Sequence, residues 1–183
     1  MPEFIGGLPL HPLLVHFVVV LLVIAPLGAL LTALWPAVRR RFGWLAFAAA
    51  AVGTALVPFA TASGENLANR VGTNPLVQTH EQLADLMIWW ALGLTVAVGA
   101  LMVVHTRAER KVTAKVAVGA AGAADTEHVG EQQNKAPALV MIGLAVLTVG
   151  LAAGTGIHVY RVGDAGARAV WEGVENLPPQ NGG

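Results

Sequence analysis

The chain has 183 residues, of which 55% are hydrophobic and only 12% are charged. Soluble domains carry about 25% charged residues, so this chain lacks the side chains that would cover a water-exposed surface. Its 11 Lys and Arg residues balance 11 Asp and Glu residues and form no basic arm, which argues against nucleic acid as a partner. The absence of cysteine excludes disulfides, thiolate catalysis and cysteine-ligated iron–sulfur clusters.

Four apolar stretches meet the length of about 20 residues that a membrane-spanning helix needs. They cover residues 13–34, 44–62, 83–104 and 136–157. Helices are expected because an open strand in lipid would leave its backbone groups unpaired. The sequence therefore predicts an all-α fold, an integral membrane four-helix bundle that forms one domain over residues 1–183 and has the lipid bilayer as its solvent.

The first helix opens on Leu10-His11-Pro12-Leu13-Leu14-Val15-His16-Phe17. Histidine at the edge of lipid is costly, so His11 and His16 are candidate functional residues. Five residues turn an ideal helix by about 140°, and the two imidazoles therefore do not share a face. We expect His16, which lies deeper, to point into the bundle, and His11 to remain at the rim in a supporting role.

Ser63, the only serine in the chain, follows the second helix. A single serine argues against a Ser–His–acid hydrolase, although the sequence leaves open whether the protein is an enzyme. Glu65 is interpreted as a solvated carboxylate or as an acceptor that orients a ligating imidazole. His80 opens the third helix, and Met87 lies on the same helical face as His80, where it could line a flat cofactor.

Residues 106–135 are biased in composition and predict a flexible loop, and residues 158–183 predict an outer-face tail. Gly150 and Gly154 form a small-residue face for packing within the bundle or between protomers.

Lys and Arg are distributed unequally between the two ends of the helices. Eight flank the inner ends, and three lie on the opposite side. The eight are Arg39, Arg40, Arg41, Arg107, Arg110, Lys111, Lys115 and Lys135, and the three are Arg70, Arg161 and Arg168. The positive-inside rule then predicts a multi-pass protein of the bacterial cytoplasmic membrane, with both connecting loops inside and both termini outside.

With this topology, four of the six histidines lie near the outer face. His16 and His80 are the preferred pair of axial ligands for one haem b, a cofactor that helix bundles hold between facing side chains. His11 and His158 are alternates, and Glu65 and Met87 complete the candidate site. Only His105 lies at the inner end of a helix, which allows at most one haem.

Two other interpretations of the histidines stay open. Imidazole also suits copper and zinc, so the same residues could bind a metal ion. Alternatively, the imidazoles bond to backbone carbonyls and to one another and bind no cofactor.

The opening motif His-Pro-x-x-Val-His-Phe resembles the signature of an uncharacterised bacterial four-helix membrane protein family. The likeness continues at Thr61-Ala62-Ser63-Gly64, at His80 and at residues 159–167, whereas His158 matches no position of the family pattern. The architecture of this family is similar to that of b-type membrane cytochromes, and some members of the family are joined to Rieske-type domains. The resemblance thus implies a redox role.

The leading hypothesis is a membrane electron-transfer protein that passes electrons between a quinol or partner protein and an outer-face acceptor, such as a Rieske-type protein. The alternative is a non-catalytic accessory subunit of a larger membrane complex, or a homo-oligomer.

Overall fold

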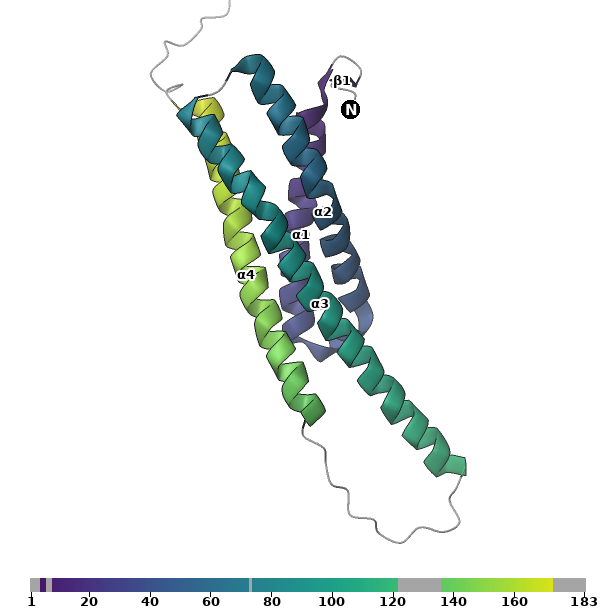
Figure 1. Cartoon of the computed structure of the whole chain (residues 1–183). Helices are drawn as coiled ribbons and strands as arrows, with labels where there is room; N and C mark the ends of the chain where they lie inside the picture. Colours follow the sequence, from purple (N-terminus) through teal and green to yellow (C-terminus); the bar gives the residue numbers. More distant parts are fainter. Residues whose placement is uncertain (1–3, 6–7, 73, 122–135, 173–183) are drawn as a thin grey trace, which may run out of the picture.

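The computed structural model describes residues 4–5, 8–72, 74–121 and 136–172. The elements, in chain order, are β1 (Phe4–Ile5), β2 (Leu8–Pro9), α1 (Leu10–Leu34), α2 (Pro36–Val71), α3 (Pro75–Ala121) and α4 (Ala136–Trp171). The helices pack as a four-helix bundle (Figure 1). Each contains a segment long and apolar enough to cross a membrane. The predicted all-α four-helix fold is confirmed; the short antiparallel pair β1–β2 at the start of the chain was not predicted.

The helices are longer than the apolar stretches that predict them. Residues 106–121 continue α3, so the prediction of a flexible loop is wrong for this part; residues 122–135 lie outside the described residues. Likewise α4 runs through His158 to Trp171, where a tail was expected. These extensions are less apolar, and hydropathy does not report helices outside lipid. Figure 1 shows α3 extending beyond the other helices.

A tight turn joins α1 to α2. Only Trp35 separates the two helices, and Pro36 occupies the first turn of α2, where a missing N–H costs nothing. The buried guanidinium of Arg39 donates to the carbonyl oxygens of Thr32 at 2.9 Å and of Ala33 at 2.6 Å. These last carbonyls of α1 have no partner within their own helix, so Arg39 caps the helix.

The buried positions of α1 recur in α3. A shift of 69 residues, which brings His11 onto His80, also superimposes the apolar stripes of the two helices. Val18, Leu22, Ala25, Ala29 and Ala33 of α1 correspond in this way to Met87, Ala91, Leu94, Val98 and Met102 of α3, and all ten are buried.

A similar correspondence links α2 to α4. A shift of 102 residues brings the buried positions Ala46, Ala50 and Ser63 onto Thr148, Ala152 and Ala165, which are also buried. The same shift places Gly64 on Gly166. The hairpin α1–α2 and the hairpin α3–α4 are therefore parallel structural repeats. We call them the first and second repeats.

The core contains two apolar clusters, in which alanine lets the helices approach closely. One, formed largely by Ala25, Ala29, Ala50 and Ala152 with larger side chains of α3, occupies the middle of the bundle. The other is formed by Val18, Leu22, Val57, Met87 and Ala91. It lies directly below the end of the bundle at which α1 and α3 begin.

Candidate functional site

His11 lies in the first turn of α1 and contacts α2. Its Nδ1 atom is 2.9 Å from the hydroxyl oxygen of Ser63. Ser63 in turn donates its only hydroxyl hydrogen to the carbonyl oxygen of Ala60, at 2.8 Å. The serine oxygen can therefore only accept from His11, so Nδ1 of the imidazole carries the proton. In the neutral ring, Nε2 then keeps a free lone pair.

His80 has the same arrangement in the second repeat. Its Nδ1 atom donates to the carbonyl oxygen of Val162 on α4, at 3.0 Å. Because a carbonyl can only accept, Nδ1 again carries the proton and Nε2 keeps the lone pair. Neither Nε2 atom takes part in a hydrogen bond within the described residues. Two imidazoles are thus fixed in the tautomer that a metal ligand requires.

A glycine supports each imidazole on the neighbouring helix. A Cβ atom added to Gly64 would lie 3.0 Å from Cε1 of His11, and one added to Gly166 would lie 3.0 Å from Cε1 of His80. Such distances are too short for ordinary carbon contacts, so each ring occupies the space of a missing side chain. The two repeats therefore hold their histidines by equivalent contacts.

The two imidazoles also interact electrostatically. Burial lowers the pKa of His11, and the neighbouring His80 lowers this pKa further, since two positive charges repel each other. The carbonyl of Ala60 opposes this effect and raises the pKa of His11. Ala60 is the repeat equivalent of Val162, which accepts from His80. His11 and His80 therefore lie close enough at this end of the bundle for their charges to interact, and the charged form of His11 is disfavoured.

His16 does not point into the bundle, and that expectation is wrong. Its side chain is exposed, and its Nδ1 atom bonds to the carbonyl oxygen of Pro12 in its own helix. The buried stripe of α1, traced back from Val18, reaches His11 instead. The repeat equivalent of His16 is Asp85, which is also exposed. The two histidines of α1 do point in different directions, as the spacing predicts, but His11 is the inward one.

His158 is buried at 4% exposure and its ring is already engaged. Nε2 donates to the carbonyl oxygen of Leu83 at 2.8 Å, and the ring stacks on Trp90 with 6.0 Å between centroids. Trp90 also fills the space beside Gly154, whose added Cβ would lie within van der Waals overlap of the indole. His158 and Gly154 thus serve packing between α3 and α4, whereas a Cβ added to Gly150 would meet no other helix within 4 Å among the described residues.

Of the other predicted site residues, Met87 is buried in the apolar cluster below the imidazoles, while Glu65 is exposed. Glu65 forms no hydrogen bond to an imidazole among residues that the structure describes. The orienting acceptors are Ser63 and Val162, which sequence reasoning missed. The recurrence of His11 in His80, and of Ser63-Gly64 in Ala165-Gly166, is the sequence signal that could have identified them.

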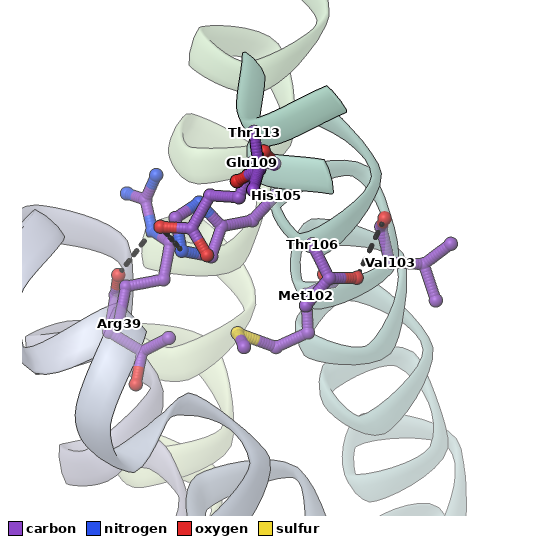
Figure 2. A network of polar contacts seen from close by, with 8 residues as sticks. Arg39, Met102, Val103, His105, Thr106, Glu109 and Thr113 are labelled. Carbon is purple, nitrogen blue, oxygen red and sulfur yellow. Dashed lines mark hydrogen bonds and ion pairs between the residues drawn. The ribbon is translucent and has the colours of Figure 1, made fainter. Parts of the chain in front are cut away.

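The opposite end of the bundle contains a separate polar group, drawn in Figure 2. Nε2 of the buried His105 lies 3.4 Å from Oε1 of Glu109, one turn further along α3, without forming a hydrogen bond. Arg39 of α2 lies at the same end. His105 is the only histidine at this end within the described residues; His128 lies outside them.

Comparison with known proteins identifies one relationship. No curated protein matches the chain, and neither does any solved structure. The family model described as "Predicted membrane protein (DUF2231)" matches residues 7–176, nearly the whole sequence. That match agrees with the four membrane-length helices and with a multi-pass membrane protein. The chain belongs to the DUF2231 family of predicted membrane proteins.

Proposed function

We propose that the protein is a membrane electron-transfer protein that binds one haem b between His11 and His80. The observation that carries this proposal is the pair of imidazoles at one end of the bundle, each with Nδ1–H bonded to the next helix and with an Nε2 that forms no hydrogen bond within the described residues. Axial haem ligands need this arrangement, because the bond at Nδ1 fixes both the tautomer and the orientation of the ring. His11 replaces His16 in the ligand pair.

The surroundings of the imidazoles fit an apolar cofactor. Val18 and Met87 lie below them in an apolar cluster, and the helices α1 and α3 contact each other less than either contacts its neighbours in the bundle. Gly64 and Gly166 allow each ring to lie close to the neighbouring helix. When bound, haem would supply reversible one-electron chemistry; the chain would supply Nε2 of His11 and of His80 and the exclusion of water.

Haem is favoured over a copper or zinc ion by the number of ligands. A porphyrin already supplies four nitrogen atoms, so two imidazoles complete its coordination. Zinc prefers four protein or water ligands. Among the described residues, no group of three or more His, Cys, Asp or Glu side chains lies close enough to hold a metal ion. Two histidines alone therefore suit haem better.

We also propose that the imidazole end faces the outside of the bacterial cytoplasmic membrane. Arg107, Arg110 and Lys111 are exposed on the extension of α3 at the opposite end, where the cytoplasm is expected. With this orientation the site would exchange electrons with a quinol in the membrane and with a Rieske-type or other redox protein on the outer face.

A reduced-minus-oxidised optical spectrum of the purified protein, combined with elemental analysis, tests the proposal. We expect a Soret band and about one iron per chain. Stoichiometric copper or zinc without a Soret band would instead favour the metal-ion function. If protein expressed with an ample haem supply contains neither haem nor metal, the electron-transfer function is wrong, and an accessory role in a larger complex becomes the better account.

A further inference from the structure

A cleft of about 190 Å³ lies between the first turns of α3 and the last turns of α4. We call it the α3–α4 cleft. It is lined by Leu76, Thr79, Leu83, Tyr160, Arg161, Asp164, Ala165 and Arg168. Its position is at the imidazole end of the bundle, on residues that flank Val162, the acceptor for His80.

The charges in this cleft do not cancel. Arg168 donates from Nε to Oδ2 of Asp164 at 2.9 Å, which pairs these two groups. Arg161 is exposed and forms no ion pair within the described residues. The side chains that line the cleft therefore sum to a charge of about +1, next to an apolar surface formed by Leu76 and Leu83. Glu172, outside the lining, also acts on Arg168, which leaves Arg161 as the cation available to a ligand. A ligand that matches both features is monoanionic at one end and apolar at the other.

The first repeat shows that the fold does not require these charges. The positions in α2 that correspond to Tyr160, Arg161, Asp164 and Arg168 are Pro58, Phe59, Ala62 and Asn66. None of these four is charged, although the two hairpins share buried positions such as Ala50 and Ala152. The tyrosine and the charged side chains are therefore particular to the second repeat, which indicates a binding role in addition to a structural one.

The cleft lies along α4 at the level expected for the lipid head groups. Residues 138–160 of α4 contain no Asp, Glu, Lys or Arg. At 1.5 Å per residue they span about 34 Å, close to the hydrocarbon thickness of a bilayer. Arg161 is thus the first charged residue where α4 leaves the apolar layer. The exposed Tyr160 precedes it, in keeping with the enrichment of tyrosine at this interface.

We propose that the α3–α4 cleft binds the head group of an anionic phospholipid such as phosphatidylglycerol. Arg161 holds the phosphodiester, because a guanidinium forms paired, charge-assisted hydrogen bonds to phosphate oxygens. Leu76 and Leu83 contact the glycerol and the first acyl carbons. The single cation that Arg161 offers matches a monoanionic head group and discriminates against a zwitterionic one. This site is independent of haem, since none of its residues is His11 or His80.

Native mass spectrometry of the full-length protein, released from detergent, tests the site. The protein is mixed with phosphatidylglycerol, phosphatidylcholine or inorganic phosphate, and bound adducts are counted. We expect a saturable phosphatidylglycerol adduct that weakens about tenfold or more in Arg161→Gln. Arg161→Lys should recover part of this affinity, because it keeps the charge but loses the paired geometry.

The matched control is Arg110→Gln, which removes an exposed arginine at the opposite end of the bundle. It should bind phosphatidylglycerol as the wild type does. Equal weakening in both variants would show nonspecific charge attraction and overturn the proposal. Equal affinity for phosphatidylcholine, or saturation by inorganic phosphate alone, would also contradict it. Unchanged circular dichroism of Arg161→Gln checks that the variant is folded.

Discussion

Nδ1 of His11 lies 2.9 Å from the hydroxyl oxygen of Ser63, the only serine in the chain. The hydroxyl hydrogen is used by Ala60, so the imidazole must be the donor. One serine thereby determines which nitrogen of His11 is free for a ligand. In the second repeat the carbonyl of Val162 has the same effect on His80.

Replacing Ser63 should release the ring of His11. In Ser63→Ala we expect Nδ1–H and Nε2–H tautomers to mix, and cofactor affinity to fall about 10- to 100-fold, as is usual when the partner of a ligating histidine is removed. Nitrogen-15 NMR of labelled histidine reports the tautomer, and haem titration reports the affinity. Thr113→Ala, which removes an exposed hydroxyl bonded within α3, is the control. Unchanged tautomer and affinity in Ser63→Ala would refute this role.

Adding a methyl group to Gly166 should displace His80. The new Cβ would lie 3.0 Å from Cε1 and 3.1 Å from Nδ1 of the imidazole, so the bond to Val162 would lengthen or break. We expect Gly166→Ala to weaken haem binding about tenfold or more. Gly163→Ala is the matched control on the same helix, because its Cβ would meet no other helix within 4 Å in the described part of the chain. If the two variants bind haem equally well, the contact with Gly166 has no functional importance.

Acid should destabilise the protein through His11. Its pKa in the folded protein is lowered from 6.5 by burial and by His80, so below about pH 6.5 the unfolded chain binds more protons than the folded one. This contribution to stability is complete above about pH 6.5 and is lost as the pH falls through the lowered pKa. Detergent-unfolding titrations at about pH 7.5 and about pH 5 measure it. A loss of the same size in His11→Gln would assign the effect to other groups.

The proposed orientation can be tested by labelling, because the natural chain contains no cysteine. Thr113→Cys places a thiol on the extension of α3, and Glu172→Cys places one beyond α4; both positions are exposed. In intact cells a membrane-impermeant maleimide should label position 172 and leave position 113 unlabelled until the membrane is opened. The reverse pattern would place the imidazole end in the cytoplasm.

The four helices were predictable because each contains about 20 apolar residues, the length that crosses a bilayer. In lipid, a single segment of this kind can pair its backbone groups only as a helix. Their true ends were not predictable in this way. Residues 106–121 and 158–171 continue as helix with charged and small side chains, for which hydropathy gives no signal. The clustering of His11, His80 and His158 at one end was predictable, because consecutive membrane helices run in opposite directions.

The direction in which each imidazole points was determined from the structure. Depth alone favoured His16, but direction depends on the buried stripe, which Val18 and Leu22 trace back to His11. The internal repeat carries the same information in the sequence, since His11 and His80 share a register that excludes His16. The sequence alone does not assign Ser63 to His11, because their hydrogen bond joins residues 52 positions apart in the chain.

The most direct test of the proposed function compares three single variants in one experiment. His11→Ala, His80→Ala and His16→Ala are purified alongside the wild type, and bound haem is measured per chain from the optical spectrum. We predict that the first two variants lose the low-spin bis-histidine spectrum, whereas His16→Ala retains it at wild-type occupancy. Loss of the spectrum in His16→Ala, or its persistence in both His11→Ala and His80→Ala, would contradict the assignment.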